Sequence, residues 1–271
     1  MIIMPSTLTS SIMLYADDAK LYRAISTQTD TRFLQEDIVA LEEWSKVWLL
    51  RFHPQKCSLL RVGLQKKAKT DYHMHQNGQD ISLEWVDSIR DLGVIMDGGL
   101  RFQEEIASRT KKANAIVGII RRTFKHLHID TFVPLFKSLV RPHLEYGAAV
   151  WHPHLRRNID ELEKVQRRAT KQVPEVRNLP YELRLERLGL PTLEHRRRRG
   201  DLIETFKILR GLYDIDHRVF FHLREDQRTR GNVWKLVKPR TRSPIRSRVF
   251  FRKESSMIGM PCQIPLSMHH R

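Results

Sequence analysis

The chain has 271 residues, 41% of them apolar, which allows one large or two small packed domains and argues against disorder throughout. Residues 1–100 hold 11 Lys/Arg against 13 Asp/Glu, a net charge of −2, whereas residues 101–271 hold 37 against 18, a net charge of +19. Such a one-sided basic half favours a nucleic-acid partner over solubility alone as its explanation. Two cysteines exclude a disulfide framework. Because neither a signal peptide nor a membrane-spanning stretch is visible, we expect an intracellular protein, nuclear or cytoplasmic, with no membrane partner.

The first elements are two short strands and a helix. Ser11–Tyr22 (SIMLYADDAKLY) places apolar residues on both sides of an Asp-Asp pair, which predicts a strand, a turn and a second strand. Asp30 or Thr31 is expected to cap the following helix, which Pro54 keeps from extending further. The spacing of five apolar residues predicts that they share one face of this helix, namely Leu34, Ile38, Leu41, Trp44 and Trp48. Its outer face is expected to carry Glu36, Asp37, Glu42, Glu43 and Lys46.

Short strands are expected next, and helices after residue 99. Strands are predicted at Ser58–Val62, at Tyr72–His75 and Ile81–Trp85 around an Asn-Gly hairpin turn, and at Asp91–Met96. Apolar residues then recur with helical spacing, which predicts helices through 106–120, from a cap at Asp130 to Pro142, through 159–173, and at 181–188 and 201–213. From Asp226 onward the chain is basic and weakly periodic, and we expect it to be poorly ordered. These elements predict an α+β fold.

The tetrad Tyr15-Ala16-Asp17-Asp18 carries the strongest chemical signal. A tight strand–turn–strand brings two carboxylates into one place, and oxygen ligands of this kind suit Mg²⁺. Polymerases use two such ions to stabilise the attacking and leaving oxygens of nucleotidyl transfer. Alone, an Asp-Asp pair is more often an ordinary solvated turn.

Several other features favour plainer interpretations. His152 and His154 have no further ligand at zinc spacing. The run Arg196–Arg199 indicates a general phosphate-binding or solvated face rather than a sequence-specific contact. The tryptophans in apolar patterns are expected in the core, namely Trp44, Trp48, Trp85 and Trp151, whereas Trp234 lies between basic residues and is a candidate for base stacking.

Long strings of this sequence resemble the reverse transcriptases of non-long-terminal-repeat, jockey-like retrotransposons. They cover roughly Leu8 to Phe251 and include SSIMLYADDAKLYRAI, LQEDIVALEEWSKVWLLRFHPQKCSLLRVG, DLGVIMD, KSLVRPHLEYGAAVW and LPYELRLERLGLPTLEHRRRRGDLIETFKIL. The resemblance implies an RNA-directed DNA polymerase that uses Mg²⁺ and takes an RNA template and a DNA primer.

The resemblance also assigns roles to single residues. It implies that Asp17 and Asp18 bind the catalytic metal ions, and that Tyr15 and Ala16 shape the turn beside the primer end. Lys56 corresponds to a lysine near the incoming nucleotide, although His53 stands where relatives more often have asparagine. It further implies a primer-gripping hairpin at Leu92 and Gly93, and template–primer backbone contacts from Arg167, Arg168 and Lys171. A solvated surface position for Lys56, and a core strand and turn for Leu92 and Gly93, are the alternatives.

The implied architecture is a partial polymerase palm, of antiparallel strands and one long helix, then a helical thumb and a basic tail. We expect the palm at 1–100, the thumb at 101–175 and a basic helical region at 176–271. Fingers, and an earlier palm strand with another metal-binding aspartate, would precede Leu8. The last 20 or so residues depart from the family, and codon logic indicates a frameshift near Phe251–Arg252. The uncovered sheet edges of such a palm predict poor solubility of the first half.

Three functional hypotheses follow. The first is a polymerase fragment that is inactive as this chain. The second is a nucleic-acid-binding remnant of a mobile element without catalysis. The third is a translated fragment with no selected role. The sequence does not determine the oligomeric state.

Overall fold

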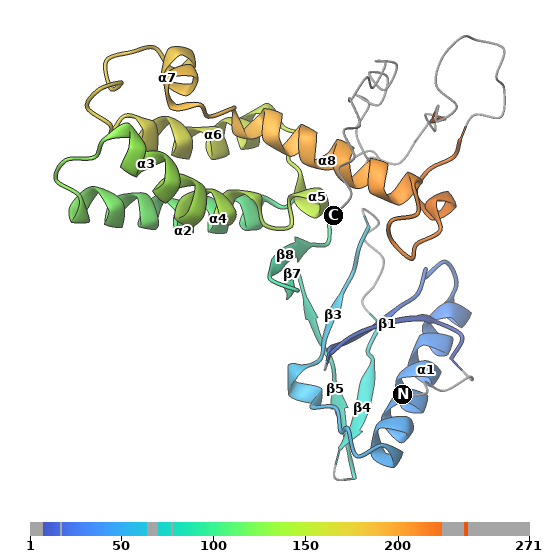
Figure 1. Ribbon diagram of the computed structural model, residues 1–271. Helices are drawn as coiled ribbons and strands as arrows, with labels where there is room; N and C mark the ends of the chain where they lie inside the picture. The colour runs from blue at the N-terminus through green and yellow to red at the C-terminus, as the bar shows by residue number, and fades with distance from the viewer. Residues whose placement is uncertain (1–7, 17, 64–69, 77, 224–235, 238–271) are drawn as a thin grey trace, which may run out of the picture. The chain divides into compact units, whose positions relative to one another are not determined.

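A computed structural model (Figure 1) describes residues 8–16, 18–63, 70–76, 78–223 and 236–237. The chain divides into two compact units, Met1–Ile89 and Arg90–Arg271, which are considered separately below. Strands and helices are both present, so the expected α+β class is confirmed at that level. Within the described residues the strands form four two-stranded sheets, and one of these, β3 with β6, is parallel rather than antiparallel.

The first unit begins with the predicted strand–turn–strand. Strands β1 (Ser11–Tyr15) and β2 (Asp18–Tyr22) pair antiparallel, with Tyr15 opposite Asp18, so that two residues form the turn. Helix α1 (Gln28–Val47) follows, and then the 3-10 turn η1 (Pro54–Lys56) and β3 (Ser58–Leu60). The predicted hairpin forms from β4 (His73–Gln76) and β5 (Gln79–Ser82), and a further short strand, β6 (Glu84–Val86), pairs with β3.

Helix α1 starts earlier than the expected cap at Asp30 or Thr31. Thr27 is the N-cap, and its side chain accepts a hydrogen bond from the Asp30 amide while the Asp30 carboxylate accepts from the Thr27 amide. This reciprocal pair is a capping box, which satisfies amides that the first helical turn leaves without partners. The hydrogen bonds from the Thr27 and Ser26 amides lower the pKa of Asp30 to about 2.

Two acidic residues of α1 expected on its outer face are buried instead. Asp37 is 3% exposed and accepts hydrogen bonds from the Thr9 and Ser10 amides at 3.0 and 2.8 Å. Burial acts to raise the pKa of Asp37, but the hydrogen bonds outweigh it and hold the pKa below its ordinary value. Glu42 is 5% exposed and accepts from the His75 amide at 2.9 Å. Asp37 therefore ties the segment just before β1 to the helix, and Glu42 ties β4 to it.

The core of the first unit is small. Ile38 of α1 packs with Tyr72, Met74 and Leu83 of the strand region. Large apolar side chains of the same unit remain exposed, among them Met13, Leu14, Tyr15, Tyr22, Val47, Trp48 and Leu49. Trp48 is 42% exposed, so the prediction that it lies in the core was wrong.

The second unit is mainly helical. After the hairpin of β7 (Ser88–Asp91), which starts just before the unit boundary, and β8 (Val94–Asp97), helix α2 (Gln103–Thr123) begins. The remaining helices are α3 (Ile129–Leu135), α4 (Arg141–Glu145), α5 (Ala148–Trp151), α6 (Arg156–Thr170), α7 (Tyr181–Leu188) and α8 (Leu193–Leu209), with the short η3 (His217–Val219) after them. Helix α2 packs against α6 and against the α3–α4 segment, and Figure 1 shows these helices grouped together.

The helix expected to end at Pro142 continues past it. A π-helical turn, η2 (Phe136–Val140), joins α3 to α4, so that Pro142 becomes an early residue of α4 rather than a stop. Inside a continuous helical run a proline removes one backbone hydrogen bond and crowds the preceding turn, and here the π-helical turn lies directly before Pro142. The expected cap is also displaced, because the N-cap of α3 is His128 and not Asp130.

One continuous core holds this unit together. Its fully buried side chains include Ala113, Phe136, Val140, Leu144, Leu162, Val173 and Leu193. Trp151 is 1% exposed, as predicted, and its indole N–H donates to the Tyr146 carbonyl at 2.8 Å. Almost all of the expected basic tail, including Trp234, the suggested frameshift and the final 20 residues, lies outside the described residues.

Candidate catalytic turn and nucleic-acid interface

The β1–β2 turn presents Asp18 at a surface. Tyr15, at the end of β1, is 63% exposed, and Asp18 begins β2 with its side chain exposed. Ala16 has a φ of 53°, a left-handed conformation found in tight two-residue hairpin turns. Asp17 lies outside the described residues, so the structure gives no geometry for the pair.

Leu92 and Gly93 form the turn of the β7–β8 hairpin. Asp91–Met96 had been expected from its pattern to be one strand, but the two residues have φ values of 44° and 81° and divide it. Positive φ at both central residues matches the twist of a hairpin. Leu92 is 44% exposed, so the tip of the turn faces outward and its side chain is not part of a packed core.

The Leu92–Gly93 turn is held by side chains that sequence reasoning did not single out. Tyr146 donates from its hydroxyl to the Leu92 carbonyl at 2.9 Å, and Arg109 donates from Nη2 to the Gly93 carbonyl at 2.8 Å. The Arg109 guanidinium also lies 4.9 Å from the centre of the Tyr146 ring. The tip of the hairpin is therefore fixed by α2 and by the residue that ends α4.

Glu105, on α2, contacts both Arg109 and the backbone of the hairpin. It is 1% exposed, pairs with Arg109 one helical turn later, and accepts a 2.9 Å hydrogen bond from the Ile95 amide. The buried carboxylate and guanidinium thus neutralise each other while both bind hairpin backbone. The only sequence signal for this role was the Glu-Arg spacing of four residues on a predicted helix, which usually indicates a surface pair.

Lys56 ends the 3-10 turn η1 with its side chain exposed. Its amide donates to the His53 carbonyl at 2.9 Å, so the turn itself is ordered. Lys56 and the β1–β2 turn both belong to the first unit, whereas the Leu92–Gly93 turn and the basic residues of α6 belong to the second.

The predicted backbone-contacting residues lie at the end of α6, and all three are exposed. Arg168 donates to the Asn114 side chain of α2 at 2.8 Å, which places its guanidinium beside that helix. Lys171 is the C-cap of α6. Arg167 stacks over Tyr181, with 4.5 Å between the guanidinium carbon and the ring centre.

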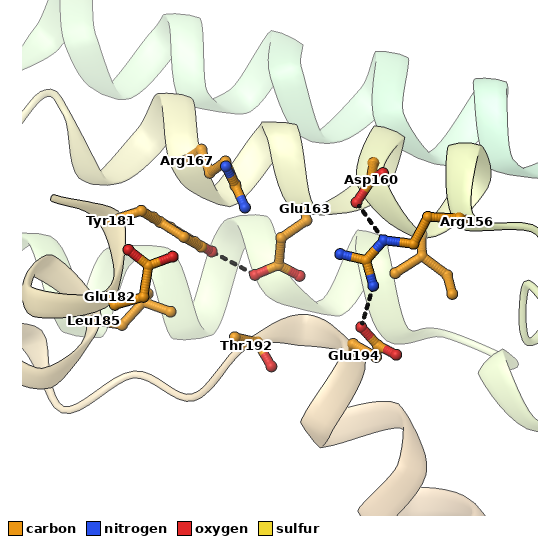
Figure 2. Close-up of a pocket in the computed structure, with 10 residues that line it drawn as sticks. Arg156, Asp160, Glu163, Arg167, Tyr181, Glu182, Leu185, Thr192 and Glu194 are labelled. Carbon is orange, nitrogen blue, oxygen red and sulfur yellow. Dashed lines mark hydrogen bonds and ion pairs between the residues drawn. The ribbon is translucent and has the colours of Figure 1, made fainter.

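A polar pocket lies beside Arg167, between α6, α7 and the start of α8 (Figure 2). At its base Tyr181 donates to Glu163, whose other oxygen accepts from the Leu193 amide at 3.0 Å. Burial and the adjacent Glu163 carboxylate raise the pKa of Tyr181 far above its ordinary value. Arg156 pairs with Asp160 and Glu194 at 3.1 and 3.3 Å. Because Arg156 pairs with two carboxylates of the lining and Glu163 binds Tyr181, most of these polar groups form structural contacts with one another.

The run Arg196–Arg199 is not the uniform phosphate-binding or solvated face that was expected. Arg196 forms a two-pronged ion pair with Glu145, and this hydrogen bonding raises the pKa of Arg196. Arg197 is 3% exposed, and burial lowers its pKa. Arg198 and Arg199 are exposed. Two of these four arginines therefore make contacts within the second unit or are buried in it.

Asp18 is not part of a group of three metal-binding side chains in the described part of the chain. Among the described residues, the one group of three side chains close enough to hold a metal ion is His73, His75 and Asp80, on another hairpin. His152, considered at first as a metal ligand, pairs instead with Asp201 at 2.5 Å. Asp18 supplies a hard oxygen ligand of the kind that Mg²⁺ prefers.

Comparison with known proteins identifies the class. The chain is 26% identical over 190 residues to the RNA-directed DNA polymerase from mobile element jockey of Drosophila melanogaster, which covers 66% of this chain and 20% of that protein. It is 25% identical over 174 residues to the probable RNA-directed DNA polymerase from transposon BS of the same species, covering 63% of this chain and 19% of that protein. An uncharacterized protein of Caenorhabditis elegans is 28% identical over 130 residues, 47% of this chain and 66% of that protein. No family model and no solved structure matches the chain.

These matches define a relative of the RNA-directed DNA polymerases of mobile elements. More closely, the chain is similar to the RNA-directed DNA polymerases of jockey-type and BS elements, which is consistent with the expected resemblance to non-long-terminal-repeat retrotransposon reverse transcriptases. It spans about a fifth of the length of those polymerases. Within the described residues, no helix has the length and apolar character required to cross a membrane.

Proposed function

We propose that this chain is part of a retrotransposon RNA-directed DNA polymerase in which Asp17 and Asp18 hold Mg²⁺ at the primer end. The observation that carries the proposal is the exposed two-residue turn between β1 and β2, with Tyr15 directly opposite Asp18. The Asp18 side chain is exposed at this end of the hairpin, where a nucleic-acid end can reach it. The relatedness to jockey-type polymerases supports this role.

In the intact polymerase the two carboxylates would bind the divalent cations, which supply charge stabilisation to the attacking and leaving oxygens. Tyr15 and Ala16 would set the position of the primer terminus against that site. Leu92 and Gly93, on a hairpin whose tip is held by Arg109 and Tyr146, would support the primer strand.

We further propose that the 271-residue chain alone has no polymerase activity. Among the described residues no third carboxylate is grouped with Asp18. Two adjacent carboxylates alone should bind Mg²⁺ weakly, because such ions rely on several carboxylates together with substrate phosphates. The test is primer extension on an RNA template with Mg²⁺ or Mn²⁺, using the chain and its Asp18→Asn variant. Equal, background-level extension supports inactivity, whereas extension by the chain that the variant lacks would refute it.

Nucleic-acid binding without catalysis is the second candidate, and the exposed Arg168 and Lys171 beside α2 favour it. Phosphate contacts release counterions, so affinity should fall steeply with salt, by a slope of about 0.9 per contacted phosphate on duplex. Filter binding across a salt series measures that slope. Replacing Arg167, Arg168 and Lys171 together with glutamine should reduce it by about three.

The matched control removes the same charge elsewhere. Arg156, Arg198 and Lys207 each pair with a carboxylate, at 3.1, 3.3 and 3.0 Å, and are less available to phosphate. Their triple glutamine variant should keep most of the slope. Equal losses in both variants would indicate attraction by net charge alone and would count against a defined interface.

A further inference from the structure

The β4–β5 hairpin brings together three side chains with metal-binding chemistry. His73 and His75 are two residues apart on β4, so their side chains share one face of the strand. Asp80 of β5 lies opposite His75 in the antiparallel register. Between the two histidines, Met74 points the other way and is 5% exposed in the core of the first unit. The alternation leaves the imidazoles and the carboxylate together on the outer face.

The distances suit a shared ion. One ligand atom from each of His73, His75 and Asp80 can be chosen so that all three lie within 4.8 Å of one another. His75 Nε2 lies 3.1 Å from Asp80 Oδ1, and the two imidazole ring centres are 5.6 Å apart. Ligand atoms around a tetrahedral zinc ion are separated by about 3.3 Å, given metal–ligand bonds of about 2.0 Å. Small side-chain rotations are enough to close the remaining difference.

The backbone that carries the histidines is fixed from behind by α1. Gln35 donates to the His73 carbonyl at 2.9 Å and accepts from the His73 amide at 3.0 Å. Glu42, itself buried, accepts from the His75 amide at 2.9 Å. Preorganised backbone positions reduce the ordering cost of binding, as metal sites on rigid elements require.

We propose that His73, His75 and Asp80 bind a divalent transition-metal ion of the zinc class. Two imidazoles and one carboxylate match the ligand preference of zinc and its neighbours, whereas Mg²⁺ prefers oxygen ligands alone. Three protein ligands leave a fourth position for water. The ion would connect β4 to β5 and lock a hairpin whose inner face supplies Met74 to the small core. The site does not depend on the proposed polymerase role.

The test is calorimetric titration of the full chain with Zn²⁺ in a buffer that does not chelate metals. The chain also has other histidines and Cys262, so variants must assign the site. His75→Gln and Asp80→Asn should each weaken the assigned binding event at least tenfold. Both positions are exposed, and circular dichroism should show that the fold is retained.

The matched control uses the same spacing of histidines in another place. His126 and His128 are also two residues apart and exposed, and His128 pairs with Glu175 at 2.8 Å, but they form no group of three ligands among the described residues. The double variant His126→Gln, His128→Gln should keep wild-type zinc affinity. Absence of zinc binding by the wild-type chain up to millimolar concentration would overturn the proposal. Unchanged binding in His75→Gln and Asp80→Asn would overturn it equally.

Discussion

The guanidinium of Arg109 donates a 2.8 Å hydrogen bond to the carbonyl oxygen of Gly93, joining helix α2 to the tip of the β7–β8 hairpin. Arg109 is 7% exposed and pairs with Glu105, which is 1% exposed. A charge buried this deeply is tolerated only when it is paired and hydrogen-bonded. The position of the hairpin tip is therefore linked to the stability of the second unit.

Replacing Arg109 with methionine should lower the free energy of unfolding by about 3–5 kcal/mol, since it leaves Glu105 buried without its counter-charge. Tyr146→Phe removes one hydrogen bond to the Leu92 carbonyl and should cost only about 1 kcal/mol. Urea unfolding of the full chain measures both. Arg101→Met, at an exposed position, is the control and should change stability by less than about 0.5 kcal/mol. Similar values for Arg109→Met and Arg101→Met would contradict the role given to Arg109.

Two glycines with left-handed backbone should differ in their tolerance of alanine. Gly147 has a φ of 64°, and an added Cβ would lie 2.9 Å from Val94 Cγ2. Gly189 has a φ of 60°, with nothing within 4 Å of such a Cβ. Gly189→Ala should cost about 1–2 kcal/mol from backbone strain alone. Gly147→Ala should cost about 1–3 kcal/mol more, because Val94 must shift in a packed core. Thermal unfolding compares them, and equal costs would count against the predicted steric contact.

The capping box of α1 should make the free energy of unfolding depend on pH in the acid range. The pKa of Asp30 is lowered to about 2, so its contribution is present above the unfolded pKa of about 4 and is lost as the pH falls towards 2. The difference in unfolding free energy between wild type and Asp30→Asn should therefore shrink between pH 5 and pH 2. Thr27→Ala removes one hydrogen bond to this carboxylate. The pH dependence of its unfolding free energy should lie between those of the wild type and of Asp30→Asn. A difference that stays constant with pH would exclude this account.

The exposed apolar residues of β1 should limit solubility. Met13 is 59% exposed on a strand that, among the described strands, pairs with β2 alone. Free strand edges with apolar side chains promote intermolecular pairing, and a lysine there opposes it. Met13→Lys should raise the concentration at which light scattering first increases. Leu183→Lys adds the same charge at a 48% exposed helical position and should have a smaller effect. Equal gains would assign the effect to net charge rather than to the strand.

The regular helices of the second unit could be predicted from the sequence, because they depend on the spacing of residues that are close together in the chain. The apolar spacing that predicted helices through 106–120, 159–173 and 181–188 corresponds to α2, α6 and α7. Each follows from side chains three or four residues apart meeting on one face. The continuation of α3 into α4 through a π-helical turn was not predicted, because Pro142 ordinarily signals an end.

The family resemblance was also visible in the sequence. The strings around Tyr15-Ala16-Asp17-Asp18 pointed to the retrotransposon reverse transcriptases, and the comparisons agree. The roles of Asp17, Lys56, Leu92 and the basic residues of α6 stay predictions.

The sequence by itself determined the helical periods, the hairpin turns and the family resemblance, since these depend on neighbouring residues or on long strings of them. Only the tertiary structure decided which polar side chains are buried and what they bind. Asp37 and Glu42 read as surface residues along the chain, yet both are buried. The physical reason is that burial of a polar group depends on a partner, and the partners of Asp37 and Glu42 lie about 30 residues away along the chain.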